Sequence, residues 1–149
     1  MTHLAFVALM SGALMAVSGT PLEHRTRLDH RSGSADAHYR ADLTVTHKQV
    51  GAVGPGGRPS TLRCSWAAGL VVQREARHVS GTVLARTIER DRVIEGSRPG
   101  WCSTHRAAIR QEVARRSGEL RDHVVTVAEE DHEMLRAELD RTHGATRTG

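Results

Sequence analysis

Alternation of apolar and polar side chains over residues 62–73 is the feature that most constrains the fold. Every second residue of this segment is apolar, and Cys64 and Trp66 fall on its apolar face. Successive side chains of a strand point to opposite faces, so a period of two predicts a half-buried strand. Residues 39–48 follow the same period and predict another strand.

The segments around these two strands predict a small antiparallel sheet. Residues 51–59 are rich in Gly and Pro, and a connection this short has no room for a helical crossover between parallel strands. After a turn at Ser80-Gly81, residues 82–90 predict a third strand. We therefore expect a three-stranded antiparallel sheet that ends before residues 96–100, where Gly and Pro return.

The period changes to a helical one after Gly100. Apolar residues then recur on one helical stripe, which comprises Ala108 or Ile109, Val113, Leu120, Val124, Val127 and Leu135. This predicts a helix over residues 103–141, either as one long helix or as a helical hairpin broken near Gly118. The predicted fold class is therefore α+β, with a small three-stranded sheet followed by helix.

A single helix of this size would be ~58 Å long at 1.5 Å per residue and would overhang a sheet of short strands. Arginines dominate its first half and acidic residues its second half. An antiparallel partner helix, from a hairpin or from a second copy, would pair these charges and cover the stripe. The alternative is that both halves are simply solvated.

The two cysteines, Cys64 and Cys102, predict one disulfide. An isolated pair in an oxidising compartment is typical of a structural bridge, and no Cys-x-x-Cys motif indicates redox catalysis. Trp101, next to Cys102, is expected to cover the bridge. The bridge would support a core that is poor in aromatic residues.

The N-terminus predicts export to the periplasm or the medium. Residues 4–17 are apolar and uncharged, and Ala16 and Ser18 have the spacing of a cleavage site, so we expect a signal peptide over 1–18. The alternative is an uncleaved N-terminal anchor or a buried helix, because the first three residues lack a lysine or arginine. After cleavage no stable membrane anchor is expected. The mature chain would be a flexible polar leader over 19–37, one domain over 38–143 and a disordered tail over 144–149.

No motif predicts catalysis or a cofactor. Ten histidines invite a metal hypothesis, but only two isolated pairs have helical spacing, Glu129 with His132 and Glu119 with His123, and we expect neither to bind metal. The strong bias toward arginine is typical of a GC-rich bacterial genome. The net charge of +4 includes no long basic run, and aromatics do not interleave with the arginines, so nucleic acid is not the expected partner.

The sequence thus favours a non-enzymatic accessory protein. It would act through contact with an unknown protein or as a homodimer through the C-terminal helix. The alternative is a module that binds a small or anionic ligand in the groove between sheet and helix, with arginines as its charge partners.

Overall fold

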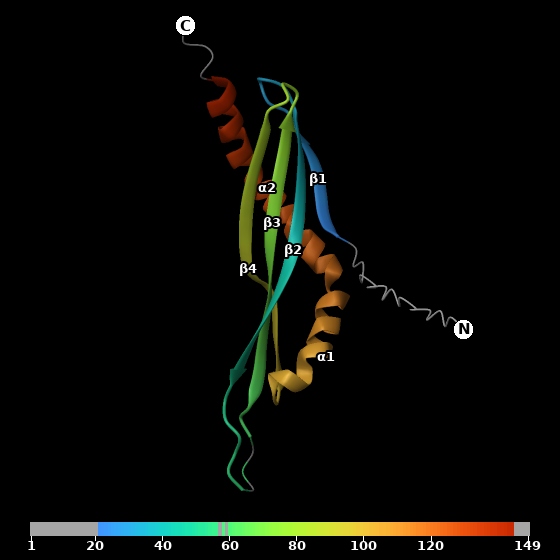
Figure 1. Ribbon diagram of the computed structural model, residues 1–149, viewed down its shortest axis with the longest axis vertical. Helices are drawn as coiled ribbons and strands as arrows, with labels where there is room; N and C mark the ends of the chain where they lie inside the picture. Colours follow the sequence, from blue (N-terminus) through green and yellow to red (C-terminus); the bar gives the residue numbers. More distant parts are fainter. Residues whose placement is uncertain (1–20, 57, 59, 145–149) are drawn as a thin grey trace, which may run out of the picture.

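The computed structural model describes residues 21–56, 58 and 60–144. Four antiparallel strands form one sheet in the order β1-β2-β3-β4, and two helices follow. The elements are β1 (Leu22–Leu28), β2 (Ala35–Val50), β3 (Arg63–His78), β4 (Val83–Pro99), α1 (Cys102–Arg115) and α2 (Ser117–Gly144). Figure 1 shows both helices passing along one side of a long, twisted sheet. The α+β class, the antiparallel sheet and the disulfide are confirmed.

The sheet has four strands rather than the expected three. The flexible leader predicted over residues 19–37 is wrong from Leu22 onward, because this region forms β1 and the start of β2. Only Leu22 and Leu28 are apolar in β1, so its sequence shows no clear period. His24 lies on the same face of β1 and places its ring 6.4 Å from that of Tyr39. A strand at the edge of a sheet needs fewer apolar residues than a central one, which explains why the pattern was missed.

The three other strands are also longer than predicted. The expected bounds were 39–48, 62–73 and 82–90, whereas each strand has 16 or 17 residues. At about 3.3 Å per residue the sheet is roughly 50 Å long. A bulge in β4 allows it to continue, since two more residues of β4 than of β3 lie between the pairs formed by Ala68 and Leu70. Arg92 within this bulge has a positive φ of 53°.

The helical segment is neither one unbroken helix nor a hairpin. It breaks at Arg116, two residues before Gly118, and α1 and α2 then continue in the same general direction in Figure 1. The backbone of Arg116 leaves helical geometry at ψ 19°, while its side chain donates two 2.9 Å hydrogen bonds to Glu119. These hydrogen bonds lower the pKa of Glu119.

The predicted apolar stripe is the inner face of both helices. Val113, Leu120, Val124, Val127 and Leu135 are each 2% exposed or less, and they pack on the buried face of the sheet. The overhang that we expected was wrong because it assumed short strands, and a sheet of about 50 Å covers most of the stripe. These side chains therefore leave no apolar stripe free for an antiparallel partner helix.

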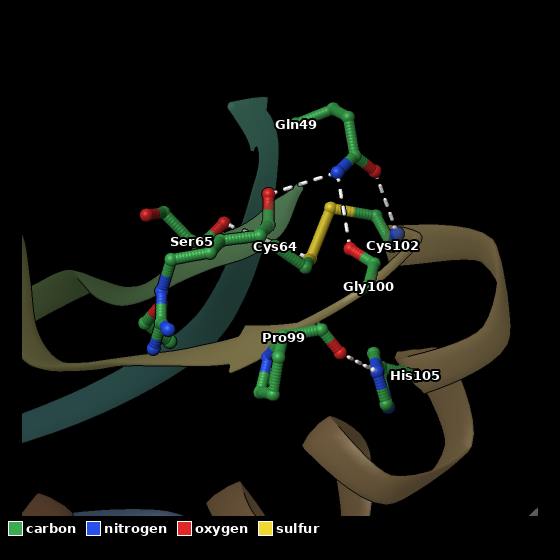
Figure 2. The surroundings of a disulfide bond; sticks show 9 residues. Gln49, Cys64, Ser65, Pro99, Gly100, Cys102 and His105 are labelled. Atoms are coloured by element: carbon green, nitrogen blue, oxygen red, sulfur yellow. Dashed lines mark hydrogen bonds between the residues drawn. A yellow bond between two sulfur atoms is a disulfide. The ribbon is translucent and has the colours of Figure 1, made fainter. Parts of the chain in front are cut away.

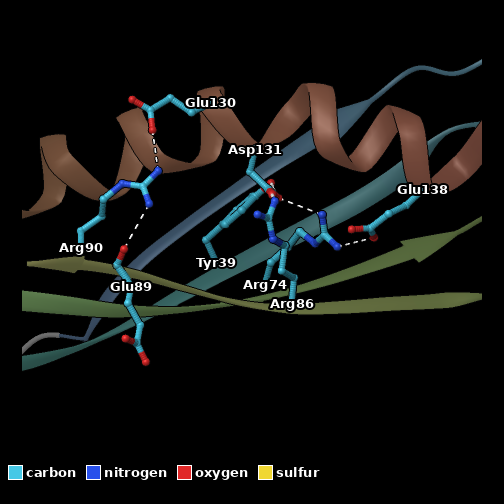
Figure 3. Close-up of polar contacts among 8 residues, drawn as sticks. All are labelled: Tyr39, Arg74, Arg86, Glu89, Arg90, Glu130, Asp131 and Glu138. Atoms are coloured by element: carbon cyan, nitrogen blue, oxygen red, sulfur yellow. Dashed lines mark hydrogen bonds and ion pairs between the residues drawn. The ribbon is translucent and has the colours of Figure 1, made fainter.

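A buried charged cluster attaches α2 to the sheet (Figure 3). Asp131 Oδ2 accepts hydrogen bonds from Tyr39 Oη at 3.0 Å and from Arg74 Nη1 at 2.9 Å. Its other oxygen, Oδ1, accepts one from Arg86 Nη1 at 2.6 Å. Arg74, whose side chain is fully buried, also donates to Glu138 Oε2 at 2.5 Å. Two acids of α2 thus neutralise two arginines of β3 and β4.

Tyr39 completes this cluster from β2. Burial raises the pKa of its phenol, and the adjacent carboxylate of Asp131 raises it further. The phenol therefore stays protonated and keeps donating to Asp131. The cluster joins β2, β3, β4 and α2 into one rigid unit.

Candidate functional site

The N-terminus of α1 is fixed to the sheet by the disulfide and by one glutamine (Figure 2). Cys64 of β3 and Cys102 of α1 have Cα atoms 4.8 Å apart, which confirms the predicted bridge. Gln49 of β2 donates to the carbonyl oxygens of Arg63 and Gly100 at 2.8 and 3.1 Å. Its own side-chain oxygen accepts from the backbone N–H of Cys102 at 2.7 Å. These contacts hold the first turn of α1 beside the end of β2.

This attachment creates a groove between α1 and β2. Ile109 and Val113 of α1 are buried, which leaves Arg106 and Arg110, one helical turn apart, beside β2. The groove has a volume of about 360 Å³ and is lined by Val45, His47, Arg106 and Arg110. We call these four residues the basic groove.

No described residue neutralises the arginines of the basic groove. Within the part of the chain that the structure describes, neither Arg106 nor Arg110 has an ion-pair partner. By contrast, Arg98 of β4 forms an ion pair with Glu112 of α1, with 2.7 Å between Nη2 and Oε2. Two unpaired guanidinium groups and an imidazole around one hollow attract an anion, since guanidinium groups bind carboxylates well.

Beside the basic groove, β2 has a free edge. β1 pairs with β2 only as far as Leu22 opposite Ala41, so residues 42–50 bond to β3 alone among the described strands. Most of these nine residues are exposed, and Leu43 is 40% exposed although it is apolar. A strand edge presents unpaired N–H and C=O groups that can bond to another chain. We call residues 42–50 the free edge.

A second polar cluster lies at the opposite end of the sheet, where two hairpin turns meet the end of α2. His30 and His78 each bind a serine two residues later, with Nδ1–Oγ distances of 2.7 Å to Ser32 and 2.8 Å to Ser80. In both turns the serine backbone N–H also donates to the same Nδ1 at 3.2 Å. Nδ1 is therefore an acceptor in both rings, and Nε2 carries the proton.

The remaining bonds of this cluster form a continuous chain. His30 Nε2 donates to Asp140 Oδ1 at 3.1 Å, and His78 Nε2 donates to Ser32 Oγ at 3.2 Å. The order Ser32, His30, Asp140 is that of a nucleophile, a base and an acid. However, acyl transfer also needs donors for the oxyanion, and the N–H groups of Ser32 and Gly33 already bond to His30. The geometry thus favours a pair of linked turns over a catalytic centre.

No family model, curated protein or solved structure matches this chain.

The other residues weighed from the sequence lie apart from the basic groove. Trp101 does not cover the disulfide as expected, because it is 54% exposed. Glu119 pairs with Arg116 at the break between the helices, and no group of three potential metal ligands occurs in the described part of the chain. No described helix has the length and apolar character needed to cross a membrane.

Sequence reasoning missed both polar regions. For the paired turns a signal exists, since His-x-Ser-Gly occurs at residues 30–33 and again at 78–81. For the basic groove the spacing of Arg106 and Arg110 is visible, but many exposed helices carry such pairs. The arginine pair forms a site only because burial of Ile109 and Val113 turns both arginines toward β2.

Proposed function

We propose that this chain is an exported protein that works by binding another protein, without catalysing a reaction. The contact surface is the basic groove together with the free edge. The observation that carries the proposal is the nine-residue free edge lying beside Arg106 and Arg110, whose charges have no described partner. The apolar stripe of the C-terminal helix is buried against the sheet, so we place the contact surface elsewhere than the sequence favoured.

Export rests on two observations. The disulfide between Cys64 and Cys102 is consistent with an oxidising, extracellular compartment. The signal peptide expected over residues 1–18 lies outside the described residues and stays a prediction. The intact mass of protein recovered from the periplasm or the medium should correspond to a chain that begins near Gly19. A chain that retains Met1 in the membrane fraction would contradict cleavage.

Site-specific photo-crosslinking tests the contact surface. A benzoylphenylalanine at Thr46, in the free edge, should give a protein adduct in the exported fraction of the producing organism. The same probe at Gln73, an exposed position of central strand β3, should give little. The double variant R106E/R110E should abolish the Thr46 adduct. Equal adducts from both positions, or none from Thr46, would contradict the proposal.

A small anion is the second candidate for the basic groove. Its volume of about 360 Å³ and its two guanidinium groups suit a di- or tricarboxylate. In that case citrate should raise the melting temperature more than sodium chloride at equal ionic strength, and R106E/R110E should remove the difference. Equal shifts with both salts would contradict this second function.

A further inference from the structure

We infer that the partner is an extended segment with acidic side chains at two alternate positions, which adds to the sheet as a fifth strand. This inference rests on the proposed function and names the partner's chemistry. The free edge offers nine residues, about 30 Å of strand, for main-chain hydrogen bonds. The basic groove then decides which side chains the segment must carry.

Strand alternation places the side chains of the free edge. Tyr39 of β2 is buried beneath the helices, so Leu43, Val45 and His47 lie on the same face. On that face Arg106 and Arg110 line the groove beside Val45 and His47. An added antiparallel strand would therefore favour acidic residues opposite Val45 and His47 and an apolar residue opposite Leu43. Threonine suits the intervening positions, which face the open side of the sheet.

Two other occupants fit the charge less well. A second copy paired through the same edge would bring a second set of Arg106, Arg110 and His47 against the first, and like charges repel. The chain's own N-terminal segment, residues 1–20, contains no aspartate or glutamate. A separate acidic segment is the occupant that complements the groove.

Peptide titration tests the inference. The probe is a capped seven-residue peptide with threonine at its odd positions, glutamate at its second and fourth positions, and valine at its sixth. It should bind the full chain, measured by isothermal titration calorimetry. Glutamine in place of both glutamates should weaken binding about tenfold, as expected for two exposed ion pairs. Added salt should weaken binding of the glutamate peptide but not of the glutamine peptide.

Two control sets separate strand addition from simple charge attraction. A peptide with N-methylated backbone nitrogens at both glutamates keeps both carboxylates but loses two strand N–H donors, so it should not bind measurably. R106E/R110E should weaken binding of the glutamate peptide at least about tenfold. The matched variant R121E/R136E makes the same charge change at exposed positions of α2 and should leave binding unchanged.

The outcomes distinguish this inference from the proposed function. Equal binding of the N-methylated peptide would overturn strand addition. A concentration-dependent dimer in analytical ultracentrifugation, dissociated by Val45→Pro, would show that a second copy occupies the edge and would also overturn it, because the N–H of Val45 points away from β3. Suppose that the glutamate peptide fails to bind while the Thr46 crosslink to another protein persists. The inference of an acidic partner segment is then wrong, and the proposed contact surface still holds. If both fail, both proposals are wrong.

Discussion

The two halves of β2 have opposite environments although they form one continuous strand. Residues 35–41 pair with β1 on one side and β3 on the other. Residues 42–50 pair with β3 alone among the described strands. The first half, residues 35–41, contains buried Ala35, Ala37 and Tyr39, and we call it the inner half. The second, which is the free edge, is mostly exposed, and we call it the outer half. The difference arises because β1 has only 7 residues and β2 has 16.

Charge follows the same division. Near the inner half, the buried arginine Arg74 is neutralised by Asp131 and Glu138, as buried charges require. Near the outer half, Arg106 and Arg110 have no described partner. The inner half thus gives the fold its stability, and the outer half leaves backbone groups and charge available for a partner.

The largest loss of unfolding free energy is expected from a substitution beside the inner half of β2. Asp131→Ala would leave Arg74 buried without its main counter-ion and would remove the acceptor of Tyr39. Losing one member of a buried ion pair costs about 3–5 kcal/mol, and we expect the upper end because Asp131 has three donors. Urea unfolding followed by circular dichroism measures the loss.

Glu130→Ala is the matched control for this experiment. Glu130 is the neighbour of Asp131 and pairs with Arg90 at 2.7 Å, but both side chains are partly exposed (Figure 3). An exposed pair contributes about 0–1 kcal/mol. Equal losses in the two variants would show that the cluster around Asp131 does not hold α2 to the sheet.

A somewhat smaller effect is expected from the disulfide, which fixes α1 beside the outer half. Replacing Cys64 and Cys102 by serine opens a closed loop, since the two residues are 38 positions apart. The chain-entropy account gives a loss of about 4 kcal/mol. The free energy of unfolding should fall by a similar amount when dithiothreitol reduces the unmodified protein. The same unfolding curve with and without dithiothreitol would contradict a stabilising role for the bridge.

A pair of glycine substitutions tests the packing behind the outer half. Trp66 pairs with Gly96 of β4, and a Cβ at Gly96 would lie 2.7 Å from the indole ring. Gly96→Ala should therefore cost about 1–3 kcal/mol. Gly118→Ala in α2 meets no atom within 4 Å and should instead stabilise the helix by roughly 0.5–1 kcal/mol. Thermal unfolding distinguishes the two, and a tolerated Gly96→Ala would refute close packing at Trp66.

Much of the inner architecture could be predicted from the sequence because its signals are local. The alternation around Cys64 and Trp66 identified β3, and the helical stripe identified the faces of α1 and α2 that are buried. The disulfide followed from an isolated cysteine pair. These features depend on periodicity or count, which the sequence displays directly.

The other features depend on tertiary packing. The sequence did not predict β1, because pairing with β2, rather than a pattern of apolar residues, makes this segment a strand. The length of β4 depends on a bulge at Arg92 that has no clear sequence signature. The groove exists because the disulfide and Gln49 set α1 beside β2, so Arg106 and Arg110 became a candidate site only in three dimensions.

Hydrogen–deuterium exchange of the β2 amides, followed residue by residue by NMR, tests the contrast between the two halves most directly. Within residues 35–41 every amide should be protected, because both sides of the strand are bonded. Within residues 42–50 protection should alternate, with amides that point away from β3 exchanging rapidly. The acidic peptide should then slow exchange of those same amides. Uniform protection of residues 42–50 in the free protein would show that the edge is already covered and would contradict the account.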